Sequence, residues 1–143
     1  MIKFELVTLD GIKFSEDVHE VRLPTPDGEI GVFLHHMPLV SIATPGIITI
    51  RRKQDDPETL LEYFATNGGV IEVLDNKVRM LVDEADAADA INEAEAKRAH
   101  EEARHLRAQA KDQISLAHAQ TMIDRTTTRL KVAELKRHRK QRR

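Results

Sequence analysis

Three histidines in the first quarter of the chain are the first candidates for metal binding or acid–base chemistry. His35 and His36 are adjacent, and His19 lies earlier in the sequence. A metal site needs three or four ligands with supporting groups behind them. Adjacent residues of an extended chain point to opposite sides, so His35 and His36 cannot both face one ion from a strand. We therefore expect this pair to lie in a loop or at an interface rather than at a metal.

The C-terminal segment carries the most concentrated charge of the chain. Residues 125–143 hold nine basic side chains and one acidic one, whereas residues 1–84 have a formal net charge of −7. A cationic end of this kind favours an acidic partner, which can be nucleic acid, anionic lipid or an acidic protein segment. All five aromatic residues lie at or before Phe64, so the basic run cannot stack on bases. Only phosphate contacts would remain, and we expect no nucleic-acid partner.

The sequence lacks the residue patterns of an active site. It has no cysteine, which excludes a disulfide framework and a thiolate nucleophile and fits a reducing compartment. It contains no His-Glu-x-x-His, no Gly-x-Ser-x-Gly and no glycine-rich phosphate loop. We expect no catalytic residue, no metal and no cofactor. No apolar run approaches the roughly 20 residues that span a bilayer, and no signal-peptide pattern opens the chain, so we expect a soluble protein.

Glycine and proline divide the chain into two parts. All six glycines and all five prolines lie at or before Gly69. Both residues mark turns, because glycine adopts positive φ and proline fixes φ near −65°. The last 74 residues contain neither and are rich in helix-forming Ala, Glu, Lys, Arg and Gln. The composition therefore predicts a β-domain followed by a helical extension.

Short apolar runs between turn signals predict the strands of the first part. Residues 18–23 alternate apolar and polar side chains, which is typical of a half-buried strand. Many short strands at close spacing indicate an antiparallel sandwich or barrel. The predicted strands cover residues 4–8, 18–23, 30–34, 39–42, 47–51, 60–64, 70–73 and 77–82.

From Ala85 onward the apolar periodicity becomes helical. Residues 111–115 interrupt it weakly, and Asp112 or Ser115 can cap a second helix there. The first seam is mostly alanine, so a partner helix gains little apolar area from it, and no residue at the joint forbids helix. A folded hairpin and one nearly continuous rod should therefore differ by roughly a few kcal/mol. The two predicted seams are Ala96, Ala99, Ala103, Leu106 and Ala110, and then Leu116, Ala119, Ile123, Thr126, Leu130 and Ala133.

Several short motifs follow one another along nearly the whole chain. They are Gly28-Glu29-Ile30-Gly31-Val32, His36-Met37-Pro38-Leu39-Val40, Pro45-Gly46, Gly68-Gly69-Val70-Ile71-Glu72-Val73, residues 78–82, and Arg125-x-x-x-Arg129 with residues 130–135. In this order the motifs resemble the epsilon subunit of bacterial F-type ATP synthases. The resemblance implies a ten-stranded β-sandwich over residues 1–86 and a regulatory helix-turn-helix with a basic tail over residues 87–143.

The resemblance also implies a role and partners. It predicts a non-catalytic central-stalk subunit of a proton-translocating synthase, peripheral on the cytoplasmic face of the bacterial plasma membrane, that links gamma to the ring of c subunits. Glu29 and its turn would face the c-ring, and the segment with His36 and Met37 would lie near gamma. An extended hairpin would oppose ATP hydrolysis near the catalytic beta and alpha subunits. The basic residues offered to that acidic partner are Arg125, Arg129, Lys131, Lys136 and Arg137.

The chain departs from a motif by which some bacterial members bind ATP. That motif reads Ile/Leu-Asp-x-x-Arg-Ala, and here residues 91–96 read Ile-Asn-Glu-Ala-Glu-Ala. Asn92 replaces the aspartate, and Glu95 places a carboxylate where a cation should face phosphate, a change of about 1 kcal/mol or more. Only Ile91, Arg125 and Arg129 match such a site, so we do not expect the chain to bind ATP as a regulatory ligand.

Two other departures concern a turn and the tail. Leu34-His35 stands where the family usually has Pro-Gly, and the tail after Leu135 is longer and more basic than usual. The alternative function is a small adaptor whose basic C-terminal helix binds nucleic acid or anionic lipid. Co-purification with gamma would favour the stalk role, and salt-dependent binding to nucleic acid or vesicles would favour the adaptor.

Overall fold

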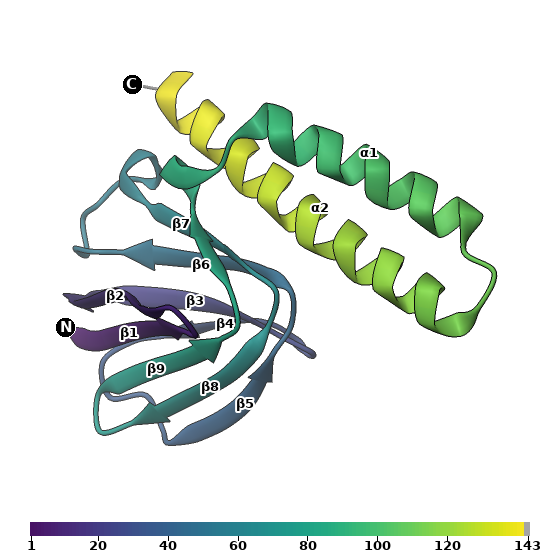
Figure 1. The fold of residues 1–143 in the computed structure, drawn as a ribbon. Coiled ribbons are helices and arrows are strands. Elements are labelled where there is room, and N and C mark those ends of the chain that lie inside the picture. The colour runs from purple at the N-terminus through teal and green to yellow at the C-terminus, as the bar shows by residue number, and fades with distance from the viewer. Residues whose placement is uncertain (142–143) are drawn as a thin grey trace.

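A computed structural model, which describes residues 1–141, has a β-sandwich with a helical hairpin packed on one side (Figure 1). Arg142 and Arg143 of the predicted basic tail lie outside the described residues. One sheet has the strand order β2-β1-β9-β8-β5 and the other β10-β7-β6-β3-β4. The strands are β1 (Ile2–Thr8), β2 (Gly11–Val18), β3 (Glu20–Thr25), β4 (Gly28–Val32), β5 (Leu39–Ala43), β6 (Gly46–Arg51), β7 (Glu62–Thr66), β8 (Gly69–Leu74), β9 (Lys77–Val82) and β10 (Ala85–Ala87).

The sandwich core forms because alternate residues of the strands turn inward. In β1, Ile2, Phe4 and Leu6 are buried while the residues between them are half-exposed. The ring of Phe14 lies 5.6 Å from that of Phe4 and packs edge-on against Phe64 at 6.1 Å, which joins the two sheets. Each such side chain contributes about 1.5–3 kcal/mol when it is fully buried. The sandwich therefore has a core of its own, independent of the helices.

The helices are α1 (Glu93–Gln109) and α2 (Gln113–Gln141). Two short 3-10 turns lie earlier in the chain: η1 (Glu58–Leu60) comes before β7, and η2 (Ala88–Ala90) connects β10 to α1. Asn92 caps α1, because its side chain accepts a hydrogen bond from the Glu95 N–H at 3.1 Å. The Asp112 carboxylate accepts from the N–H of Ser115 at 2.8 Å, which begins α2. The hydrogen bond from the Ser115 N–H is the first cause that holds the pKa of Asp112 below its ordinary value. The predicted break between two helices is confirmed, with Asp112 as the cap.

The ten-stranded sandwich and the helical hairpin agree with the expected fold, and three details differ. β2, a polar edge strand in which Phe14 and Val18 are the buried residues, is absent from the predicted strands. The helical periodicity expected from Ala85 is wrong at its start, because residues 85–87 form β10 and α1 begins at Glu93. Finally, β1 and β9 pair in parallel, while the other strand pairs are antiparallel among the described residues.

Candidate functional site

The helical hairpin meets the sandwich through one face of α2. Val132 and Ala133 are buried against Ala65 and Ala88 of the sandwich side, and Ala96 of α1 belongs to the same cluster. Val132 has no exposed surface. Figure 1 shows α2 lying between the sandwich and α1, so α1 is held mainly through α2. Release of α2 would therefore free the whole hairpin.

Three ion pairs line the edge of this contact, and we call them the latch pairs. Arg125 lies 2.7 Å from Glu84, Arg129 lies 3.2 Å from Asp86, and Lys136 lies 3.1 Å from Asp89. All six side chains are partly exposed, so each pair contributes at most about 1 kcal/mol. The hydrogen bond from Lys136 is the main reason that the pKa of Asp89 lies below its ordinary value.

The last turns of α2 add contacts beyond the latch pairs. The ammonium of Lys136 also donates to the carbonyl of Ala88 at 3.3 Å, and Arg139 donates to the carbonyl of Leu61 at 2.8 Å. Arg137 pairs with Glu93 of α1 at 3.2 Å. The side chain of Lys131 is exposed. Four of the five cations that the sequence offered to an acidic partner are thus paired within the chain, and Lys131 faces solvent.

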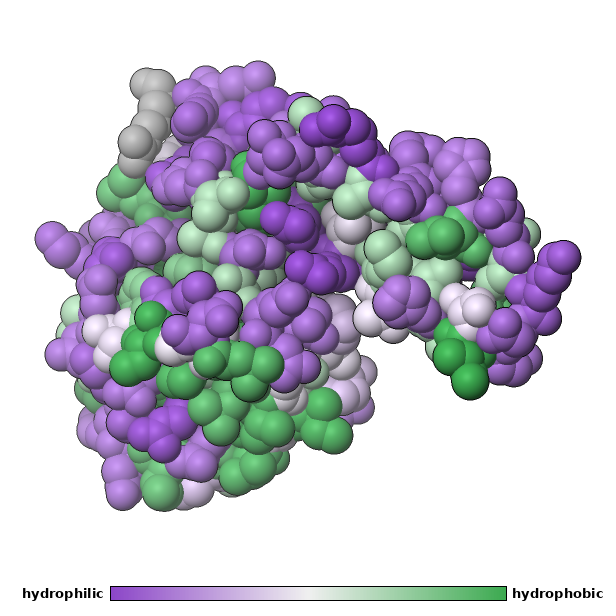
Figure 2. Space-filling model, viewed as in Figure 1, coloured by the Kyte–Doolittle hydropathy of each residue, from purple (hydrophilic) through white to green (hydrophobic). Residues whose placement is uncertain are grey.

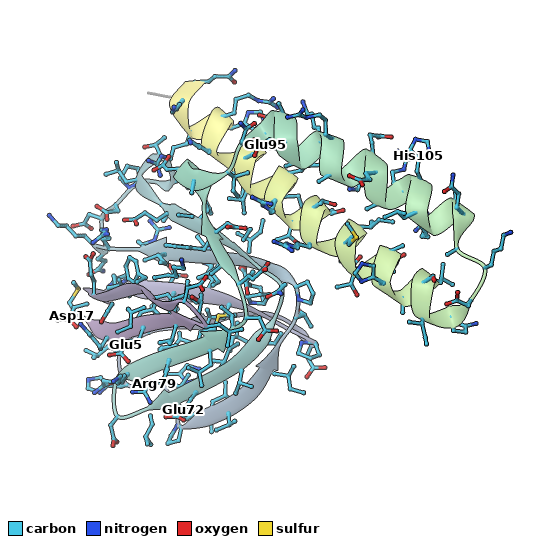
Figure 3. All side chains as sticks on the ribbon, viewed as in Figure 1. Glu5, Asp17, Glu72, Arg79, Glu95 and His105 are labelled. Atoms are coloured by element: carbon cyan, nitrogen blue, oxygen red, sulfur yellow. The ribbon has the colours of Figure 1, made fainter. Side chains whose placement is uncertain are left out.

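A small cavity lies between Arg125 and Arg129. The cavity that they line with Glu84, Asp86 and Asn67 has a volume of ≈ 10 Å³, about that needed for one water molecule. Its carboxylates would repel phosphate. Of the other positions of the ATP motif, Ile91 is buried, Asn92 caps α1, and Glu95 is exposed at the start of α1, where Figure 3 labels it.

The outer face of the sheet that contains β1 carries a row of aliphatic side chains, which we call the apolar row; four of them are exposed and Val7 is half-buried. The pairing registers place its members side by side across five strands. Figure 2 shows the green of hydrophobic residues gathered over this part of the sandwich. The row consists of Ile12, Val7, Leu81, Val70 and Ile42, in that order.

A charged row runs beside the apolar row. Glu72, Arg79 and Glu5, labelled in Figure 3, are neighbours across β8, β9 and β1. Glu5 pairs with Arg79 at 3.3 Å and with Lys77 at 3.0 Å, and the hydrogen bond from Lys77 is the first cause of its lowered pKa. The face as a whole therefore combines an apolar stripe with an ordered polar border, as docking surfaces of proteins do.

The predicted partner-binding residues of the sandwich lie at strand ends and edges. Met37 is 72% exposed in the turn before β5, and His36 beside it is half-buried. Glu29 is exposed on β4, an edge strand. His35 has a φ of +64°, the left-handed conformation that glycine favours, and its N–H donates to the Asn76 side chain at 2.7 Å. The turn thus keeps a glycine-like backbone although the sequence has Leu34-His35.

Two sets of residues in this region were not singled out from the sequence. The latch carboxylates of Glu84, Asp86 and Asp89 lie in a run with four acids in seven residues, Asp83 to Asp89, and that density was the available signal. His100 of α1 contacts the hydroxyl of Thr126 of α2 at 3.0 Å and joins the two helices. A lone histidine in a helix gave no signal for that contact.

Comparison with known proteins identifies the class of protein to which this fold belongs. The family described as "ATP synthase, Delta/Epsilon chain, beta-sandwich domain" matches residues 1–88. The chain therefore belongs to the ATP synthase delta/epsilon chain family. Within it, the chain is 34% identical over 139 residues to the ATP synthase epsilon chain of Herpetosiphon aurantiacus, covering 96% of this chain and 98% of the relative. It is 38% identical to the epsilon chain of Syntrophobacter fumaroxidans, covering 93% and 96%.

Solved structures share the fold. A chain of the Euglena gracilis mitochondrial ATP synthase, in a structure of its OSCP, F1 and c-ring, has a TM-score of 0.78 at 24% identity, covering 93% of this chain and 81% of that one. A chain of the Tetrahymena thermophila mitochondrial ATP synthase central stalk and c-ring has a TM-score of 0.55 at 13% identity, covering 90% and 95%. Among the described residues, none of the helices is both long and apolar enough to cross a bilayer.

Proposed function

We propose that this chain is a non-catalytic rotor subunit of the central stalk of an F-type ATP synthase. In this role its sandwich joins the gamma subunit to the c-ring, and its hairpin restrains ATP hydrolysis by the catalytic beta and alpha subunits. The observation that carries the proposal is the match to epsilon chains over 96% of the chain, hairpin included. The chain would then lie at the membrane through the complex, on the cytoplasmic side of a bacterial plasma membrane.

The apolar row is the face that we assign to gamma. A monomeric protein gains nothing from a row of largely exposed aliphatic side chains that spans a whole sheet, whereas a permanent partner would bury it. Met37 and His36 lie in the turn that leads into β5, the strand that bears Ile42 of the row. The same partner can thus cover the turn and the sheet. Glu29, on the edge strand of the other sheet, is left for the polar loops of the c-ring.

The hairpin is the part that we assign to regulation. The hairpin is held on the sandwich by a small apolar cluster and by partly exposed ion pairs. Together these contacts contribute roughly a few kcal/mol to the free energy of docking. Coupling between sites in proteins is typically about 1–3 kcal/mol, so interactions within the complex can shift a docked–released equilibrium of this size.

ATP is not the ligand that controls this hairpin in our proposal. Arg125 and Arg129, the two cations available for phosphate, are paired with Glu84 and Asp86. A nucleotide would have to separate α2 from β10 and break both pairs. Titration of the isolated protein with ATP should therefore show no micromolar binding, and a micromolar dissociation constant would contradict this part of the proposal.

Truncation of the assembled enzyme tests the two roles separately. A chain ending after Ala88 keeps all ten strands and loses the hairpin. We expect it to co-purify with gamma and the c-ring and to give a higher rate of ATP hydrolysis than the full chain. An unchanged rate would refute the regulatory role alone. Loss of co-purification by a chain carrying Val70→Asp, with Asp75→Asn as an exposed control, would support the gamma face; retained co-purification would refute it.

The adaptor alternative finds less support. Its basic helix should present free cations to nucleic acid or lipid, and Arg125, Arg129, Lys136 and Arg137 are each paired with a carboxylate.

A further inference from the structure

Two buried polar atoms lie without hydrogen-bond partners where the hairpin meets the sandwich. They are the side-chain oxygen Oδ1 of Asn67, which follows β7, and Nε of Arg129 in α2, and within residues 1–141 no other buried side-chain atom is left in this way. Arg129 Nε lies 3.2 Å from the Asp86 carboxylate as an ion pair, but its N–H is not directed at that carboxylate for a hydrogen bond. Folded proteins seldom leave such atoms without a protein or water partner. A third group between the two atoms would satisfy both.

The two atoms belong to residues that line the same cavity. This cavity has a volume of ≈ 10 Å³, which is about the space that one water molecule needs. The carboxylate-bearing residues Glu84 and Asp86 and the cation Arg125 also line it. The space therefore admits one water molecule or one small ion.

The hydrogen-bonding character of the two atoms selects water over an ion. Arg129 Nε carries a hydrogen and can only donate, so the occupant must accept a hydrogen bond from it. Asn67 Oδ1 can only accept, so the occupant must also donate. A metal cation does not accept hydrogen bonds, and a halide does not donate them. Water is the small molecule that does both.

We propose that one structural water occupies this cavity and joins the hairpin to the sandwich. The N–H of Arg129 donates to the water, and the water donates one of its protons to Asn67. Its second proton faces the carboxylates of Glu84 and Asp86. The water thus connects α2, the turn after β7 and β10, three elements that pack together (Figure 1). A bridge of this kind is nearly as favourable in enthalpy as a direct hydrogen bond.

Asn67 becomes a positioning residue for the docked hairpin, although it makes no direct hydrogen bond to α2. In the sequence it stands in the turn Asn67-Gly68-Gly69, where turn chemistry alone accounts for an asparagine. Loss of its carboxamide would remove one partner of the water and weaken the hold on Arg129. The bridge is a property of the chain by itself, so it can be tested without the assembled enzyme.

A high-resolution crystal structure of the full-length chain tests the position of the water. We expect a density peak about 2.7–3.2 Å from both Arg129 Nε and Asn67 Oδ1, the ordinary range of hydrogen bonds. Crystals soaked in rubidium or in bromide should show no anomalous signal at this peak. A docked hairpin without the peak would overturn the proposal, and so would an anomalous signal from either ion.

Native-state hydrogen exchange of the full-length chain tests the role of the water in solution. Asn67→Ala should speed exchange of the α2 amides near Arg129 by about three- to tenfold, as the loss of one hydrogen bond implies, and leave β1 and β9 protected. The matched control is Gln109→Ala, which removes an exposed carboxamide at the end of α1 and should change nothing. An unchanged α2 rate in Asn67→Ala, or an equal loss of protection in the strands, would contradict the bridge.

A double-mutant cycle separates the bridge from a local effect on the turn. In a chain that carries Arg129→Met, one end of the bridge is already gone. Adding Asn67→Ala to that chain should therefore speed α2 exchange by less than about twofold, because residues that share one partner are not additive. The same fold-change in both backgrounds would show that Asn67 acts without Arg129 and would overturn the proposal.

Discussion

Val132→Ala tests whether the hairpin docks and releases as a unit separate from the sandwich. Val132 is fully buried between Ala65 and Ala88 of the sandwich side and Ala96 of α1. The substitution deletes two methyl groups at about 0.8 kcal/mol each and leaves a small cavity. We expect docking to weaken by about 2 kcal/mol, which is about 30-fold in the docking equilibrium. Because the ion pairs that remain are weak, this loss should populate the released hairpin measurably.

Native-state hydrogen exchange of the isolated chain measures this effect. Amides of α2 near Val132 should exchange about 30-fold faster in the variant, while those of β1 and β9 keep their protection. Two controls bracket the result. Ile114→Ala alters a side chain that is 85% exposed and should change nothing, and Val18→Ala in the sandwich core should lower the stability of the strands. If Val132→Ala loosened the strands and α2 equally, the hairpin would not be a separate unit, and our reasoning would fail.

Three other changes have expected outcomes. His35→Gly should raise the free energy of unfolding by about 0.5–1 kcal/mol in urea denaturation, because the left-handed backbone at φ +64° penalises a side chain; a lower midpoint would argue against that strain. Acid should release the hairpin: the docked pKa of Asp89 lies below its ordinary value, so its contribution is complete above about pH 4 and is lost as the pH falls through the docked pKa. Asp89→Asn should show a smaller acid effect on α2 exchange, and an identical effect would remove Asp89 from the latch. Ile42→Asp should weaken co-purification with gamma, since it places a charge in the apolar row, whereas Asp75→Asn should leave co-purification intact.

The two-part architecture was predictable because it depends on local chemistry. Glycine and proline mark the turns of the β-domain and are absent from the helices. This contrast follows directly from the backbone angles that the two residues allow. The joint at Asp112 was predictable for the same reason, since a side chain that accepts from an N–H three residues on acts within one turn.

β10 was not predictable, because its residues have low intrinsic strand preference. Ala85, Asp86 and Ala87 form a strand only by pairing with Thr66, Ala65 and Phe64 of β7. That pairing is a property of the folded sandwich, which overrides local preference. β2 was missed for a related reason: an edge strand with polar residues on both faces lacks the regular alternation that marks a half-buried strand.

The position of the candidate site was only half predictable. The cations of α2 were visible as a charge run, and their need for acidic partners followed from electrostatics. Their partners within the chain were not visible, because Glu84 and Arg125 are 41 positions apart and meet only when the hairpin folds back. The apolar row was hidden in the same way, since its five members come from five strands and become neighbours only through the sheet registers.

The role of the hairpin in restraining hydrolysis is tested most directly by the rate of ATP hydrolysis by the assembled enzyme carrying Glu84→Gln, Asp86→Asn, Asp89→Asn. This variant keeps every cation of α2 and loosens the hairpin from the sandwich. We expect hydrolysis slower than with the wild-type chain, in contrast to the faster hydrolysis expected after truncation at Ala88. A rate equal to or above that of the wild type, with the chain fully incorporated, would contradict the claim that a released cationic hairpin restrains the enzyme.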